Sequence, residues 1–204
     1  PFTELLRTHF VPVVIGCLLL AGTGCFNGLF FSHLPGYLSG VLKYDPRQAV
    51  LSQTVGVIAS AIGILITGWI GDRIPPRHLL RAGVALLLVF AWSFYGALES
   101  RAMNLTMLCV LAGLAAGLTN GSFAVLLTDL FPTRVRFTGV ALVFNVAFTI
   151  FSGTAPLVAT TLIRDTGRVT SPAYMMMASA ALALVGSLLV DRHGGNVLAR
   201  RRSQ

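Results

Sequence analysis

Six long apolar runs constrain the fold of this chain more than any other feature of its sequence. They cover roughly residues 10–38, 49–70, 79–98, 104–128, 138–163 and 173–190. A helix needs about 20 mostly apolar residues to cross the hydrocarbon core of a bilayer, and each run is close to that length or longer. Lipid offers backbone groups no hydrogen-bond partner, and the runs lack the alternation of a membrane β-barrel. The sequence therefore predicts an all-α fold, a polytopic membrane bundle of six transmembrane helices.

The gaps between the runs carry the residues expected at helix ends. Asp45-Pro46 precedes the second run, Pro75-Pro76 separates the second from the third, and Ser171-Pro172 opens the sixth. Proline suits the first turn of a helix, because its missing N–H would have had no intrahelical partner there. These gaps are too short for a soluble domain.

Composition excludes several other classes of protein. Hydrophobic residues make up 55% of the chain and charged residues only 11%, whereas soluble domains carry about 25% charged residues. The net charge of +8 comes from residues in short gaps between apolar runs, so nucleic acid is not an expected partner. Three cysteines lie inside apolar runs without metal-binding spacing, so we expect neither a metal nor another cofactor.

The positive residues predict an orientation in the membrane. Ten would lie on one side, namely Arg7, Arg73, Arg77, Arg81, Arg134, Arg136, Arg192, Arg200, Arg201 and Arg202. Five would lie on the other side, namely Lys43, Arg47, Arg101, Arg164 and Arg168. The more positive side is expected to be cytoplasmic, with both termini of this segment there. Residues 1–191 would then form the six-helix bundle and 192–204 a basic cytoplasmic tail.

Polar side chains inside the spans are amides and hydroxyls, and no Asp, Glu, Lys or Arg lies at the centre of a span. The candidates for a substrate cavity are Thr23, Asn27 and Phe30 on one face of the first span, Asn120 in the fourth, and Asn145 and Thr149 in the fifth. An unpaired amide in hydrocarbon costs several kcal/mol. Each must therefore meet another helix, as interhelical bonding, or a water-filled cavity. Taken together, the three asparagines favour a shared polar cavity.

Small residues recur every four positions in three of the spans. The stripes are Gly113, Gly117 and Gly121 in the fourth span, Gly24 and Gly28 in the first, and Gly56 and Ser60 in the second. Such stripes let helix backbones approach closely in membranes, so we expect tight helix pairs there.

Two loops on the more positive side each crowd an acid against arginines. One runs from Gly68 to Arg77 and contains Asp72, and the other runs from Asp129 to Gly139. Topology alone explains juxtamembrane arginine, but not two acid-and-arginine loops separated by a helical hairpin. We expect Asp72 to be stabilised at a helix N-terminus or to pair with Arg136.

At these loops the sequence resembles the major facilitator superfamily, and within it the metabolite:proton symporter family of bacterial inner membranes. The family motif Gly-x-x-x-Asp-Arg-x-Gly-Arg-Arg/Lys is matched at Gly68, Asp72, Arg73 and Arg77, with Pro75 and Pro76 replacing Gly and Arg. The run Glu-x-Phe-Pro-x-x-x-Arg-x-x-Gly is matched at Phe131, Pro132, Arg136 and Gly139, with Asp129 replacing Glu.

The resemblance implies helices seven to twelve of a twelve-helix secondary transporter, built from inverted three-helix repeats. Helices seven, eight, ten and eleven would line a cavity, while nine and twelve pack outside. It implies alternating-access transport of a small carboxylate or zwitterionic osmolyte, with protons as the coupling ion. The other expected partners are the lipid bilayer and an N-terminal six-helix half. A cytoplasmic gate would comprise Gly68, Asp72, Arg73, Arg77, Asp129, Arg134 and Arg136.

Two alternatives remain open at this point. The chain is a non-transporting remnant or interaction partner if no N-terminal half accompanies it. An integral-membrane enzyme is disfavoured, because the four histidines, His9, His33, His78 and His193, lie at different depths and no two acids meet within the membrane. We therefore do not expect an enzyme.

Overall fold

The chain forms the six membrane-crossing helices that the sequence predicts. The structure, a computed structural model, describes residues 5 and 7–193 of the 204. Six helices are long and apolar enough to span a membrane: Phe10–Val41, Pro46–Gly71, Pro76–Ser100, Leu105–Asp129, Arg136–Thr166 and Pro172–Asp191. No strand occurs within the described residues. The all-α, polytopic membrane fold is confirmed; residues 194–204 of the expected basic tail lie outside the described part.

Four spans are single helices, and the first and fifth are composite. The single helices are α4 (Pro46–Gly71), α5 (Pro76–Ser100), α6 (Leu105–Asp129) and α9 (Pro172–His193). The first span joins α2 (Phe10–Asn27), the π-helical segment η1 (Gly28–His33), α3 (Leu34–Gly36) and the π-helical segment η2 (Tyr37–Val41). The fifth span joins α7 (Arg136–Ala147), the π-helical segment η3 (Phe148–Gly153) and α8 (Ala155–Thr166). Both composite spans run past the ends predicted for them.

Side-chain caps and first-turn prolines begin the single helices. Pro46, Pro76 and Pro172 stand in the first turn of α4, α5 and α9. At the start of α4, Asp45 Oδ2 accepts a hydrogen bond from the Gln48 N–H at 2.9 Å. Asn104 caps α6 through a 2.9 Å bond from the Thr106 N–H. Each cap satisfies a backbone donor that the helix leaves unpaired.

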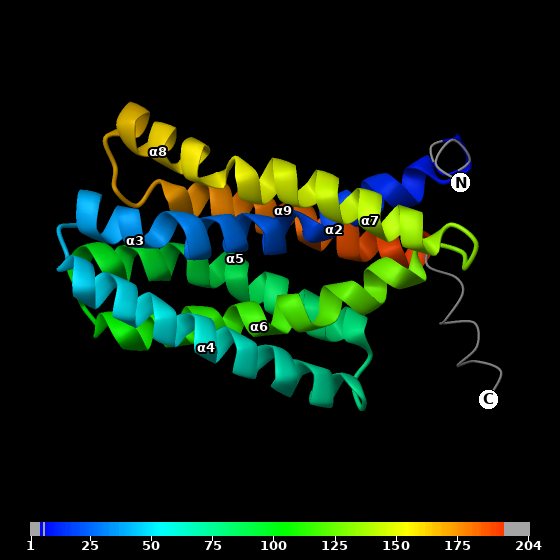
Figure 1. Cartoon of the computed structure of the whole chain (residues 1–204), viewed down its shortest axis with the longest axis horizontal. Coiled ribbons are helices and arrows are strands. Elements are labelled where there is room, and N and C mark those ends of the chain that lie inside the picture. Colours follow the sequence, from blue (N-terminus) through cyan, green and yellow to red (C-terminus); the bar gives the residue numbers. More distant parts are fainter. Residues whose placement is uncertain (1–4, 6, 194–204) are drawn as a thin grey trace.

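The connections alternate between the two ends of the bundle. The α4–α5 and α6–α7 loops lie at the same end as the start of α2 and the end of α9 (Figure 1). The η2–α4, α5–α6 and α8–α9 loops lie at the opposite end (Figure 1). The two acid-and-arginine loops therefore share one end, as the sequence predicts.

At the opposite end, Tyr44 and Arg101 join two of the loops. The Arg101 guanidinium stacks 4.5 Å from the centre of the Tyr44 ring and donates to the Leu42 and Lys43 carbonyls at 3.1 and 3.2 Å. The Tyr44 hydroxyl donates to the Leu98 carbonyl at 2.9 Å. Burial raises the pKa of the Tyr44 phenol, which keeps it a neutral donor at ordinary pH. These bonds hold the outer end of the first span against the end of α5.

The closest helix pair is α4 with α6, which run in parallel. A Cβ added to Gly117 would lie 2.6 Å from the Gly63 carbonyl carbon, and one added to Gly121 would lie 2.8 Å from Thr67 Cβ. A Cβ on Gly113 would overlap the Gly56 carbonyl oxygen. Backbone thus packs on backbone, and the predicted tight pair is confirmed for these stripes.

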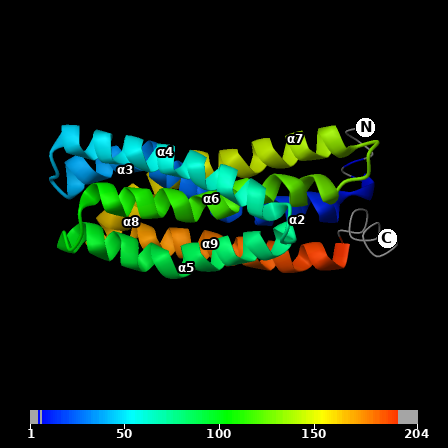
Figure 2. The ribbon, with the colours of Figure 1, turned by 90° about the horizontal axis from the view of Figure 1, so that it is seen from below.

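The helices pack in three tiers, and the pairing between them repeats. α5 and α9 lie side by side behind α2 and α6, while α4 and α7 flank the other side (Figures 1 and 2). α4 packs on α6 as α7 packs on α2, and α5 packs on α6 as α9 packs on α2. If spans one, two and three change places with spans four, five and six, the α4–α6 pair becomes the α7–α2 pair, and the α5–α6 pair becomes the α9–α2 pair. Two three-helix repeats predict this pairing.

Large apolar side chains are exposed on the outside of α4, α5, α9 and the fifth span. They include Ile58, Leu65, Trp69, Val89, Phe137, Leu157, Val185 and Leu188. This surface suits contact with lipid tails. The fifth span is the least buried of the six, and its side that faces away from the other helices is called the open side below.

Candidate functional site

Two of the predicted asparagines meet at the interface of α2 and α6. The Asn27 Nδ2 amide donates to Asn120 Oδ1 at 3.5 Å, across 93 positions of sequence. Both side chains are half-buried. Asn27 Oδ1 is enclosed and has no partner among the described residues. The pair is long for a hydrogen bond and leaves hydrogen-bonding capacity free in an otherwise apolar region.

Thr23 and Phe30 lie on α2 and η1, deeper in the bundle than the asparagine pair. Thr23 is 1% exposed, and its hydroxyl is enclosed without a hydrogen-bond partner in the described part of the chain. Phe30 is 3% exposed, and its ring meets α4, where a Cβ on Gly56 would lie 2.8 Å from Phe30 Cζ. In this conformation both side chains are closed off rather than open to a solute.

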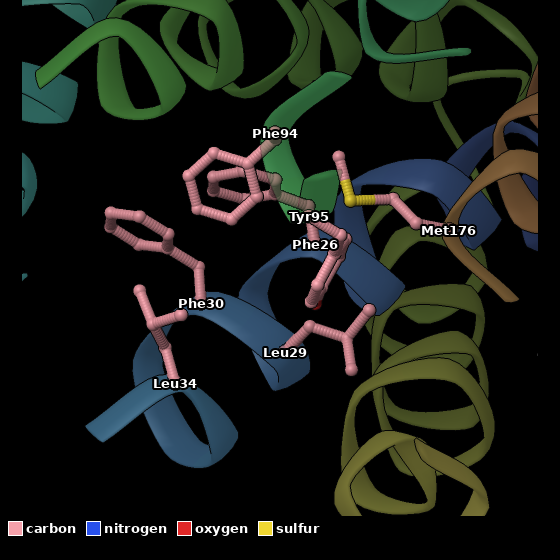
Figure 3. Close-up of a pocket in the computed structure, with 7 residues that line it drawn as sticks. All are labelled: Phe26, Leu29, Phe30, Leu34, Phe94, Tyr95 and Met176. Atoms are coloured by element: carbon pink, nitrogen blue, oxygen red, sulfur yellow. The ribbon is translucent and has the colours of Figure 1, made fainter. Parts of the chain in front are cut away.

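Phe30 also lines a small cavity between the first span, α5 and α9. The cavity has a volume of about 10 Å³, close to that of one water probe. Its lining is apolar and aromatic, as Figure 3 shows: Phe26, Leu29, Phe30, Leu34, Phe94, Tyr95 and Met176. This cavity is too small for an organic solute.

Asn145 and Thr149 do not join the asparagine pair by any hydrogen bond in the described residues. Both are exposed, in α7 and η3 respectively, and Asn145 Nδ2 donates to the Ala141 carbonyl of its own helix at 2.8 Å. They instead place polar groups on the open side of the fifth span. The three-asparagine cluster expected from the sequence is thus a pair, with Asn145 on the neighbouring helix.

The π-helical segments η1 and η3 were not foreseen from the sequence, and they contact each other. Gly28 allows this contact, because a Cβ there would overlap the Ser152 carbonyl oxygen and lie 2.7 Å from Ala155 Cβ. π-helical turns inside α-helices are frequent at functional sites. The sequence feature that could have indicated these turns is a proline in the first and in the fifth span, Pro35 and Pro156, each shortly after a π-helical turn.

Gln53 on α4 supplies a hydrogen-bond donor to backbone carbonyls of η1. Pro35 has no N–H and so cannot donate to the carbonyls four and five residues before it, which belong to Phe31 and Phe30. The Gln53 Nε2 amide donates to both of them, at 3.1 Å and 2.9 Å. A side chain from another span therefore replaces the donor that proline removes.

The first acid-and-arginine loop differs from the expectation for Asp72. Asp72 caps the C-terminal end of α4, where the helix dipole is negative, so the predicted place at a helix N-terminus is wrong. Its carboxylate is exposed and forms no ion pair or hydrogen bond within the described residues. Arg73 lies over the Trp69 ring at 4.4 Å, and a Cβ on Gly68 would meet open space.

Arg77 has a partner that the sequence did not reveal. It lies 3.8 Å from Asp191 near the end of α9, and Arg81 pairs with the same carboxylate at 2.6 Å. Arg81 also donates to the Ser187 carbonyl at 2.9 Å. Because these contacts depend on the packing of α5 against α9, no local motif could have identified Asp191.

In the second loop, an arginine side chain is hydrogen-bonded to the backbone of the same loop. Asp129 ends α6 and is half-buried, and Arg134 is exposed. The Arg136 Nε group donates to the Phe131 carbonyl at 3.2 Å. The alternative expectation of an Asp72–Arg136 ion pair is not met among the described side chains. The described residues also contain no group of His, Cys, Asp and Glu able to hold a metal.

Comparison with known proteins gives relatives that span the whole bundle. A citrate-proton symporter of Klebsiella pneumoniae is 29% identical over 199 residues, covering 97% of this chain and 45% of the relative. A citrate-proton symporter of Salmonella typhi is 28% identical over 195 residues, covering 94% and 45%. The ectoine/proline transporter ProP of Corynebacterium glutamicum is 26% identical over 190 residues, covering 91% and 37%. The chain thus spans less than half the length of these relatives.

The names of these relatives are those of transporters and not of enzymes, as expected from the sequence. The family model for the Major Facilitator Superfamily matches residues 1–156. With this match, six membrane-spanning helices and a repeated helix pairing, the chain belongs to the major facilitator superfamily.

Proposed function

We propose that this chain is the C-terminal half of a secondary transporter that moves a small organic solute together with protons. The asparagine pair on α2 and α6 is the observation that carries this proposal. Its amides keep unused hydrogen-bonding capacity inside a bundle whose span centres bear no charge. The relatives named as citrate-proton symporters and as an ectoine/proline transporter support the same activity.

The remainder of the proposed transporter is an N-terminal six-helix half. The chain covers 45% of the length of the citrate-proton symporters, and the open side of α7 carries Asn145 and Thr149. Polar groups on this side would be costly against lipid, so a second bundle and an aqueous cavity are its proposed surroundings. Alternating access would expose that cavity to each side of the membrane in turn.

The proposed cytoplasmic gate lies at the end of the bundle that holds both acid-and-arginine loops (Figure 1). Asp72 and Arg73 project from this six-helix unit without an ion pair in the described residues, and Gly68 leaves room beside α4 for another backbone. In the gate, these groups would contact the N-terminal half when the cytoplasmic side is closed. Asp129, Arg134 and Arg136 form its second loop, and Arg77 supports it through Asp191.

The proposed orientation follows the positive residues. The end with Arg73, Arg77 and Arg136 would face the cytoplasm of a bacterium, with the inner membrane as the location. Both termini of the bundle segment, residues 1–191, would then lie on the cytoplasmic side, and residues 192–204 would form a cytoplasmic tail.

Uptake by the complete gene product tests the proposed transport. We expect purified protein in vesicles to accumulate labelled citrate, proline or glycine betaine when a pH gradient is imposed, and to lose the accumulation when a protonophore removes the gradient. Asn120→Ala should lower uptake at least about tenfold, because the amide pair is lost. Ser93→Ala on the exposed side of α5 serves as its control. Accumulation that ignores both the protein and the gradient would refute the proposal.

A further inference from the structure

A row of three phenyl rings begins one helical turn from the asparagine pair. Phe123 follows Asn120 by three residues on α6, so the two side chains lie on neighbouring positions of one helix face. The Phe123 ring lies 6.4 Å from that of Phe144 on α7, and Phe144 stacks on Phe148 at 4.3 Å with 17° between the rings. The row therefore crosses from α6 to α7, both of which also contact α2.

This row runs from the edge of the hydrophobic core, where Phe123 and Phe148 pack, to the open side of the bundle at Phe144. Phe144 is 40% exposed, its neighbour Asn145 is exposed, and Phe123 and Phe148 are half-buried. Exposed apolar side chains also occur on the fifth span, at Phe137, Ile150 and Leu157, as they do on α4, α5 and α9. The small closed cavity beside Phe30 lies toward α5 and α9 (Figure 3). The Phe144 ring thus lies with the Asn145 amide on the side where a solute can reach them.

The chemistry of this surface distinguishes the two classes of solute. The face of an aromatic ring attracts a cation within about 6 Å of its centre, and quaternary ammonium groups are recognised in this way. A carboxylate would instead require a charged donor such as arginine, and no Lys or Arg lies at the centre of any span. The surface offers π faces and amides to the cationic end of a solute.

We propose that Phe123, Phe144 and Phe148, with Asn120 beside them, bind the ammonium end of a zwitterionic solute. The inference rests on the proposed transport and selects one of its two solute classes. Asn27 acts as a positioning residue, because its amide donates to Asn120 Oδ1 and restrains the carboxamide that flanks the rings. The carboxylate end of the solute points away from this surface, toward the N-terminal half.

A charge-specific comparison tests the row of rings. Glycine betaine and 3,3-dimethylbutanoate have nearly the same shape, but the second carries carbon in place of the quaternary nitrogen. In the complete gene product in vesicles, we expect glycine betaine to bind at least about tenfold more tightly than 3,3-dimethylbutanoate, measured as inhibition of labelled solute uptake. Phe144→Leu and Phe148→Leu should each reduce this ratio by roughly 2- to 30-fold, the range for one lost cation–π contact.

Matched variants separate charge recognition from a packing defect. Phe144→Tyr keeps a ring face and should preserve the ratio, as should Phe90→Leu, whose ring packs beside Phe94 on α5 away from the asparagine pair. A merely structural role for Phe144 would lower uptake but leave the ratio of the two inhibitors unchanged, and that result would overturn the inference.

The same assay distinguishes this inference from the proposed function. Citrate uptake that neither glycine betaine nor proline inhibits would overturn the zwitterion site and leave proton-coupled solute transport standing. Failure to accumulate citrate, proline and glycine betaine alike under an imposed pH gradient would overturn both.

Discussion

At the scale of single residues, the charge of Asp72 lies where no partner within the described six-helix unit stabilises it. Asp72 stands at the C-cap position of α4, where the unpaired helix carbonyls make its negative charge unfavourable. The described residues offer it no ion pair. By contrast, the Asp191 carboxylate is satisfied by Arg77 and Arg81. An acid that destabilises its own helix end suggests a role in contact with another part of the protein.

Replacing Asp72 with asparagine should therefore separate stability from transport. In the complete protein we expect Asp72→Asn to slow uptake several-fold, because the proposed gate loses its charge. The free energy of unfolding should stay constant or rise by about 0.3–1 kcal/mol, since the clash with the helix dipole is relieved. Thermal unfolding in detergent and initial uptake rates give the two quantities. Asp165→Asn, in an exposed pair at the opposite end, is the control, and an unchanged uptake rate for Asp72→Asn would remove the gating role.

At the scale of elements, the parallel pair α4–α6 is the closest helix contact in the bundle. Gly113→Ala would bring a Cβ against the Gly56 carbonyl oxygen, and backbone cannot yield as a flexible side chain can. We expect a loss of about 1–3 kcal/mol of stability, the usual cost of overpacking, seen as a lower midpoint of thermal unfolding. Gly96→Ala on α5, where a Cβ meets open space, should leave the midpoint nearly unchanged. Equal midpoints for the two variants would contradict the close packing.

The stability of the π-helical segment η1 in the first span should depend on Gln53 and Pro35 together. Gln53→Leu leaves the Phe30 and Phe31 carbonyls without their side-chain donor, and we expect it to cost about 0.5–1.5 kcal/mol of unfolding free energy. Pro35→Ala restores the missing backbone N–H, so Gln53→Leu should cost less in that background. A double-mutant cycle of thermal unfolding measures the difference. Independent, additive effects would mean that Gln53 does not replace the donor lost at Pro35.

The sequence predicted elements more completely than contacts between them. Apolar length located all six spans, and Pro46 and Pro172 marked helix starts, because these signals are local. It predicted a polar cavity shared by Asn27, Asn120 and Asn145, of which the structure brings Asn27 and Asn120 together. It did not predict the π-helical turns before Pro35 and Pro156, whose geometry depends on donors such as Gln53 from another helix. The Asp191 partner of Arg77 and the exposed place of Asn145 likewise depend on how helices pack.

At the scale of the whole molecule, the bundle has two unlike sides. α5 and α9 lie on one side of α2 and α6 (Figure 2), and their exposed large apolar side chains suit lipid. α4 and α7 lie on the other side (Figure 2), where Asn145, Thr149 and Phe144 of the fifth span are exposed. A bundle with one apolar and one mixed polar-aromatic surface fits a half that closes around a solute with a second bundle.

The central claim is that the amide pair borders water and solute rather than lipid or packed protein. The most direct measurement places a single cysteine at Asn120 in the complete protein, after Cys17, Cys25 and Cys109 are replaced by alanine. Leu65→Cys, on the 74% exposed outer side of α4, is the matched control. A membrane-impermeant thiol reagent should modify the cysteine at position 120, and transported solute should slow that reaction, while the cysteine at position 65 stays unmodified. A cysteine at position 120 that never reacts, or that reacts at the same rate with and without solute, would contradict the account.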